Sequence, residues 1–93
     1  MLSQIPIDLK KVKPENLDQE ILRAGIIGEF DAINLYEQMA AMTANQNLKK
    51  VLKDIAKEEK THVGEFQALL LKVDSEQAGE LKKGKEEVEA LTG

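Results

Sequence analysis

The chain has 93 residues, a formal net charge of -4 and no cysteine, which fits one small domain and excludes disulfides, thiolate zinc sites, iron–sulfur clusters and cysteine nucleophiles. A pI near 5.0 and lysines interleaved with acids, as on a solvated helix face, argue against nucleic-acid binding. Apolar runs last only a few residues, so we expect a soluble, cytosolic protein without a signal peptide or membrane span.

The first predicted element is an N-terminal arm. Residues 1–16 contain both prolines and no sustained helical period, so we expect an extended arm that could pack on a neighbouring chain. Asn16 is a good N-cap, and Asp18 and Glu20 suit the positive end of a helix dipole. A helix is therefore predicted over 17–44, which contains no proline.

A short polar break follows at 43–47, where Asn47 can cap a second helix over 48–73. Ser75 can cap a shorter third helix over 75–92, which its glycines weaken. The sequence thus predicts a single all-α domain over 1–93, an antiparallel two-helix hairpin with an arm and a C-terminal helix. A hairpin cannot enclose a core alone, so two copies should dimerise into a four-helix bundle.

Each long helix carries one stripe of residues at alternating steps of four and three, typical of a packed helix seam. In the first helix the stripe is Leu22, Ile26, Glu29, Ile33, Tyr36 and Ala40. In the second it is Leu48, Leu52, Ile55, Glu59, His62, Phe66, Leu69 and Val73. Both stripes become charged or ionisable in the middle, at Glu29, Glu59 and His62.

Burying unpaired carboxylates costs several kcal/mol, on the order of the whole stability of a small domain. Bridging metal ions would remove that penalty, and carboxylate oxygen with imidazole nitrogen suits iron or manganese, with zinc as a further candidate. Glu59 and His62 form a Glu-x-x-His pair on one helix face. Di-iron carboxylate bundles use one Glu from each of two helices and Glu-x-x-His from each of the other two. One chain supplies half of that set, so a twofold axis would complete it with four carboxylates and two imidazoles.

Each signal has an ordinary alternative, because Glu-x-x-His arises by chance and a lone histidine on an apolar stripe is often a hydrogen-bonded core residue. The combination is stronger, since antiparallel packing brings Glu29 and Glu59 to heights that differ by roughly 6 Å. Glu58 is a rival ligand four residues before His62. The stripe selects Glu59 and leaves Glu58 on the flank.

Other residues near the predicted site have secondary roles or purely structural ones. Tyr36 lies seven residues after Glu29 and could either hydrogen-bond a ligand carboxylate or simply pack. Asp31 is a surface charge that could help iron enter. Gly25 and Gly28 lower helix propensity, which indicates a close approach to the helix beside Glu29.

The segments LRAGIIGEFDAINLYEQMA and IAKEEKTHVGEFQALLL resemble the ferritin-like domain of encapsulated ferritins and, more distantly, that of rubrerythrin. The resemblance is strong over roughly residues 17–73. It implies that Glu29, Glu59 and His62 are iron ligands and that Tyr36 is the nearby tyrosine. It further implies a ferroxidase that binds two iron ions per dimer, forms a decameric ring of dimers and works inside a cytoplasmic encapsulin nanocompartment that stores the product.

The resemblance also implies two relations to the shell, as cargo or as a domain fused to the shell protein. The ending EVEALTG resembles such a fusion junction, and no shell-targeting peptide follows it. Two other functions compete with the ferroxidase: a rubrerythrin-like di-iron or manganese peroxide scavenger, and a metal-independent helical oligomerisation module.

Overall fold

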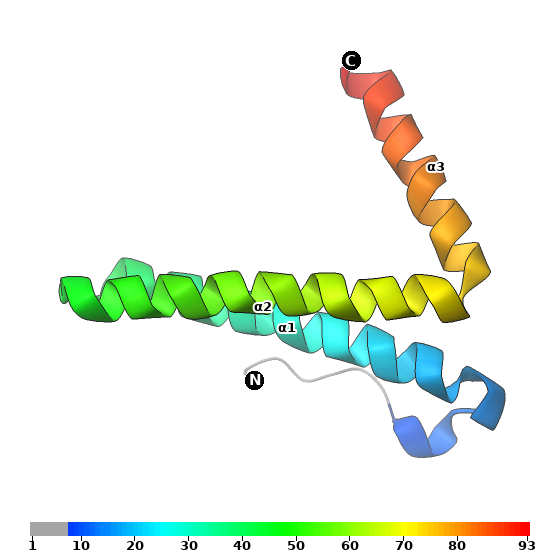
Figure 1. Ribbon diagram of the computed structural model, residues 1–93, viewed down its shortest axis with the longest axis horizontal. Helices are drawn as coiled ribbons and strands as arrows, with labels where there is room; N and C mark the ends of the chain where they lie inside the picture. Colours follow the sequence, from blue (N-terminus) through cyan, green and yellow to red (C-terminus); the bar gives the residue numbers. More distant parts are fainter. Residues whose placement is uncertain (1–7) are drawn as a thin grey trace.

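The computed structural model describes residues 8–93, and all regular secondary structure in that range is helical, as predicted. The elements are η1 (Leu9–Lys11), η2 (Pro14–Asn16), α1 (Leu17–Met42), α2 (Gln46–Val73) and α3 (Ser75–Thr92). α1 and α2 lie side by side as a long hairpin, and α3 leaves the far end of α2 and points away from both (Figure 1). None of the described helices combines the length and apolar character that a membrane span requires.

The predicted extended arm is wrong for residues 8–16, which contain two short 3₁₀ turns. Pro14 stands at the start of η2, where its missing N–H is not needed for a hydrogen bond. Asn16 makes no side-chain capping bond, because the chain enters α1 directly from η2. Residues 1–7 of the predicted arm lie outside the described residues.

The hairpin turn has the predicted length of three residues but lies two residues earlier in the chain than predicted. α1 ends at Met42, two residues before the predicted end, and α2 begins at Gln46, two residues before the predicted start. The cap of α2 is Asn45 rather than Asn47. Its Oδ1 accepts hydrogen bonds from the backbone N–H groups of Asn47 and Leu48, both at 3.0 Å. Asn45 thus satisfies two of the free donors at the start of the helix.

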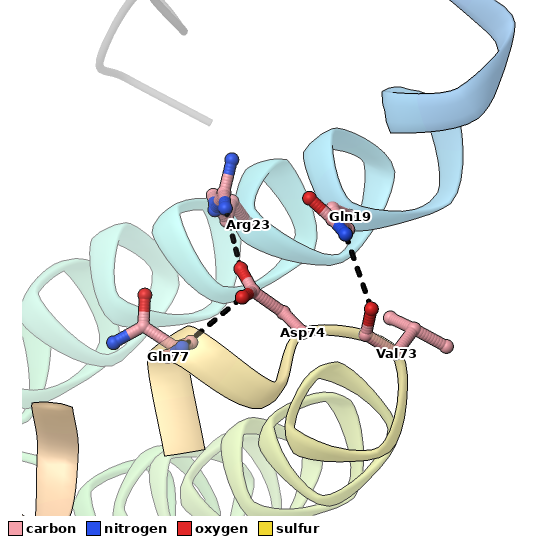
Figure 2. A network of polar contacts seen from close by, with 5 residues as sticks. All are labelled: Gln19, Arg23, Val73, Asp74 and Gln77. Carbon is pink, nitrogen blue, oxygen red and sulfur yellow. Dashed lines mark hydrogen bonds and ion pairs between the residues drawn. The ribbon is translucent and has the colours of Figure 1, made fainter. Parts of the chain in front are cut away.

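Asp74, not Ser75, caps α3, and its carboxylate also ties the junction to α1 (Figure 2). Oδ1 accepts a hydrogen bond from the backbone N–H of Gln77 at 3.0 Å, while Oδ2 pairs with the Arg23 guanidinium at 2.7 Å. Gln19 donates to the carbonyl oxygen of Val73 at 3.1 Å, one of the free acceptors at the end of α2. The base of α3 is therefore held by α1, although every side chain from residue 79 onward is exposed.

A single chain buries little apolar surface. The buried residues of the described range are Ile33, Ala40, Leu52, Ala56 and Leu70, and all of them lie between α1 and α2 or at the ends of that contact. The radius of gyration is 16.4 Å, whereas a compact domain of this length would have about 12 Å. The hairpin therefore leaves many of its large apolar side chains exposed.

The predicted stripe of α2 divides into two rows. Leu52, Glu59 and Phe66 are buried or half-buried. The neighbouring row at seven-residue intervals is more open, because Leu48 and Leu69 retain 47% and 53% of their exposure and the His62 side chain retains 45%. The division is incomplete, because Ile55 in the second row is half-buried and Val73 in the first row is 47% exposed. The exposed members of the second row, Leu48, His62 and Leu69, form an open flank of the hairpin.

Candidate metal centre

Three side chains from the two long helices meet near the middle of the hairpin. Glu29 lies halfway along the 26-residue α1, and Glu59 and His62 lie in the middle of the 28-residue α2. Glu59 and His62 point the same way because residues three apart share a helix face. The antiparallel turn then brings Glu29 level with them, so the structure places together the three residues predicted from the stripe.

The three side chains can each offer one ligand atom within 4.8 Å of the others. His62 Nδ1 lies 3.5 Å from Glu29 Oε2 and 3.4 Å from Glu59 Oε2. The two glutamate side chains are 19% exposed, whereas the imidazole is 45% exposed and lies on the open flank. The two carboxylates of the cluster are therefore mostly covered by the hairpin, whereas its imidazole is open to solvent on the flank of α2.

Glu29 Oε2 is a buried oxygen without a hydrogen-bond partner. His62 Nδ1, at 3.5 Å, is too far away to form a normal hydrogen bond. A buried acceptor left in this way is costly, more so on an ionisable group. A cation between Glu29, Glu59 and His62 would satisfy that oxygen, and the oxygen and nitrogen donors fit iron or manganese without any sulfur ligand. The residues present thus fit a metal site, to which this chain offers two carboxylates and one imidazole.

A hollow of about 520 Å³ opens beside the carboxylates. Tyr36 and Asp31 both line it, so the structure places these two predicted secondary residues beside the cluster. The rest of its wall consists mainly of small or apolar side chains, namely Ala24, Gly25, Gly28, Ala32, Leu35 and Phe66. A polar cluster in a largely apolar recess is a typical setting for a bound metal or small ligand.

The close approach predicted at Gly25 is made by the ring of Phe66. A Cβ added at Gly25 would lie 3.2 to 3.3 Å from three ring carbons, closer than ordinary van der Waals contact. Gly25 lies one helical turn before Glu29, and Phe66 lies one turn after His62. The sequence placed Phe66 only on the packing stripe, and nothing local marked its ring as a wall of the site.

Other acidic side chains close to the cluster in sequence are exposed. Glu58 is exposed, as the stripe predicted, and Glu65, seven residues later, is exposed as well. Glu37 is paired with Lys60 at 2.8 Å on the surface. The rival ligand Glu58 therefore belongs to the solvated face of α2.

Comparisons with known proteins point to one family. The rubrerythrin family model matches residues 20–92. A ferritin-like-encapsulin shell fusion protein of Pyrococcus furiosus is 56% identical over 95 aligned residues, which cover 100% of this chain. The encapsulin nanocompartment cargo protein EncC of Myxococcus xanthus is 35% identical over 71 residues, or 76% of this chain. The chain spans 28% of the first relative and 55% of the second, so it corresponds to a part of each.

The fold also matches a solved structure, the encapsulated ferritin domain from Pyrococcus furiosus. The TM-score is 0.86 at 55% identity, and the match covers 100% of this chain and 97% of that one. This likeness confirms the predicted ferritin-like helical fold and the resemblance to encapsulated ferritins. It extends over α3 as well as the hairpin, because the whole chain is matched.

Proposed function

Because this chain belongs to the rubrerythrin family of ferritin-like proteins, we propose that two copies form a di-iron site that oxidises Fe(II) to Fe(III). The observation that carries the proposal is the cluster of Glu29, Glu59 and His62, in which a buried carboxylate oxygen has no hydrogen-bond partner. The cluster has the donor atoms of an iron site and half of the ligands that two ions require. A second copy supplies the other half.

The open flank of α2 supports this pairing. It carries the partly exposed imidazole of His62 between the exposed side chains of Leu48 and Leu69. Association of two flanks would cover apolar surface and bring two half-sites together in one step. Since the cluster lies at the middle of both long helices, a twofold axis through it lets the two hairpins overlap along their full length.

Fe(II) is the substrate in this proposal, and each ion gives one electron to an oxidant, dioxygen or peroxide. The four carboxylates of the dimer bind Fe(III) more tightly than Fe(II), because their negative charge favours the more positive ion. The hairpin walls hold the carboxylates at fixed positions and limit the access of bulk water. Tyr36 and Asp31, which line the same hollow, would orient a ligand carboxylate and attract incoming Fe(II), respectively.

We further propose that the product passes to an encapsulin shell. The relatives named above are an encapsulin shell fusion protein and an encapsulin cargo protein, which supports a place for this chain inside such a shell, as a fused domain or as cargo. The exposed apolar side chains of α3, among them Val88 and Leu91, provide a surface through which dimers could associate further into a ring. A decamer is the expected size, from the resemblance to encapsulated ferritins.

The proposal is tested by adding Fe(II) to metal-depleted protein in air and recording the growth of near-ultraviolet absorbance. We expect Glu29→Ala and His62→Ala to abolish the protein-dependent oxidation. Glu58→Ala is the matched control, because its carboxylate is next to Glu59 in sequence but exposed, and it should oxidise iron at the rate of the unmodified protein. Unchanged rates in both ligand variants would end the assignment.

Membership of the rubrerythrin family favours one second candidate, a peroxide scavenger that uses the same metal pair. Stopped-flow oxidation of bound Fe(II) by peroxide and by dioxygen, at equal concentrations, separates the two. A ferroxidase continues to turn over as Fe(II) is supplied and accumulates Fe(III). A scavenger reacts much faster with peroxide and needs a reductant for each further turnover.

A further inference from the structure

We propose that Phe66 is a positioning residue of the metal site, whose ring, seated on Gly25, excludes water from the ions held by Glu29 and Glu59. The inference rests on the proposed function, because it assigns a role toward the metal to a side chain that is not itself a ligand. Its starting point is the contact between the ring and the bare backbone of α1.

Gly25 is needed at its position because of the ring. A Cβ there would lie 3.2 Å from Phe66 Cε2 and 3.3 Å from Cδ2 and Cζ, so an alanine would force the ring to shift by a few tenths of an ångström. A glycine inside a helix is otherwise unfavourable. Its presence in the middle of a long helix is explained by the space that it leaves for the aromatic ring.

The ring closes the end of the site that lies toward the open end of the hairpin. Phe66 lines the same hollow as Glu29 and Glu59 and lies one turn beyond His62 on α2. Toward the hairpin turn the hollow continues to Tyr36, while Ile33 and Ala56, which are 7% and 2% exposed, fill the contact between the two helices. Without the ring, the hollow would extend along the hairpin toward the open end.

The apolar ring of Phe66 affects the metal by limiting the number of water molecules that can reach it. A hollow of about 520 Å³ can hold many waters, and each water near the ions competes with the carboxylates for a coordination position. The apolar shell around a metal site controls solvent access and thereby the ligands that the ion retains. Phe66 should therefore lower the number of waters bound to the metal, while the ring itself contacts no ion.

The test counts those waters directly. Tb(III), a hard cation that prefers carboxylates, is bound to the metal-depleted protein, and its luminescence lifetime is compared in H₂O and D₂O to give the number of coordinated waters. Glu59→Ala identifies the site by loss of the bound Tb(III). We expect Phe66→Ala to raise the count by on the order of one water per ion, and Phe66→Leu, which keeps an apolar wall, to stay near the unmodified protein.

Leu70→Ala is the matched control. Leu70 is 4% exposed, one turn beyond Phe66, and lies outside the hollow that contains the carboxylates. Its truncation should destabilise the hairpin without changing the water count. An equal count in the Phe66→Ala and Leu70→Ala proteins would overturn the role of the ring while leaving the metal site intact. Failure of the unmodified protein to bind Tb(III) through Glu59 would refute the proposed metal site, and this inference with it.

A second measurement tests the seating of the ring. Gly25→Ala should lower the midpoint of thermal unfolding when Phe66 is present, because the new methyl group meets the ring. In the Phe66→Leu background the same substitution should lower the midpoint much less or raise it, since the shorter side chain gives way and alanine favours the helix. An equal loss in both backgrounds would show that the ring does not lie on Gly25, and would overturn the proposal.

Discussion

Glu29→Gln should change stability in opposite directions in the metal-free and the iron-loaded protein. In the metal-free protein, Glu29 Oε2 is buried without a hydrogen-bond partner, and such a group costs about 1–3 kcal/mol. Glutamine keeps the shape and leaves the polar atom unpaired but removes the buried charge, so the metal-free variant should gain on the order of 1 kcal/mol, which for a domain of this size corresponds to a rise of about 4–8 °C in Tm. With iron bound, the variant should lose stability, because the amide is a poorer ligand than the carboxylate.

The size of the loss follows from mass action. A metal present at a hundred times its Kd stabilises the folded protein by about 2.7 kcal/mol, and the variant forfeits most of that gain. The assay is thermal unfolding followed by circular dichroism, once with a chelator and once with anaerobic Fe(II). Glu37→Gln is the control, because Glu37 is half-exposed and paired with Lys60 at 2.8 Å, so its neutralisation should cost about 0–1 kcal/mol in both conditions. A metal-free Glu29→Gln protein that unfolds earlier than the unmodified chain would refute the reasoning.

Three further predictions concern the ends of the helices and the open flank. Asp74→Ala should lower the free energy of unfolding in urea by about 1–2 kcal/mol through loss of a cap. Asp74→Asn keeps the cap and should lose at most about 1 kcal/mol from the ion pair. Equal losses in the two variants would contradict the capping role. Asn45→Ala should lower Tm through a loss of about 1 kcal/mol, while Asn47→Ala should leave Tm nearly unchanged. A larger loss for Asn47→Ala than for Asn45→Ala would show that Asn47 is the cap, as the sequence predicted. Leu69→Glu should weaken self-association in sedimentation experiments, because it places a charge on the open flank, whereas Leu91→Glu at the exposed end of α3 should leave the hairpin dimer intact; equal effects would show that the flank is not the interface.

The sequence predicted the existence and order of the three long helices, because their polar breaks and apolar period are local properties. It chose the wrong caps at two of them. Asn45 and Asn47 are both asparagines and would cap a helix equally well. Asn45 is the cap because α1 ends at Met42 and α2 already begins at Gln46. Asp74 prevails over Ser75 because Arg23, 51 residues earlier in the chain, binds its second carboxylate oxygen. That contact is tertiary, and no local pattern contains it.

The cluster of Glu29, Glu59 and His62 could be predicted because its signal is a conflict: ionisable groups occur where the helical period requires apolar ones. The division of the α2 stripe into a more covered row and a more open row could not be predicted from the sequence. Each row contains apolar side chains and one ionisable residue, Glu59 or His62, so composition does not show which row packs within the chain. That depends on the tertiary contact between α1 and α2. The sequence therefore located the candidate ligands, but it did not show that the imidazole of His62 is the most exposed of the three side chains, at 45%.

In the proposed dimer, iron binding and association depend on each other. A single chain offers three ligands, so an ion bound to it keeps water at the remaining positions and binds weakly. Pairing replaces those waters with the partner's carboxylates and imidazole, and by linkage iron must then tighten the dimer by the same factor by which pairing tightens iron. Within the described range, two of the five buried residues are alanine, so the small core of the single chain contributes little to fixing the geometry of the metal-free hairpin. Ferrous iron would thus assemble the site that oxidises it.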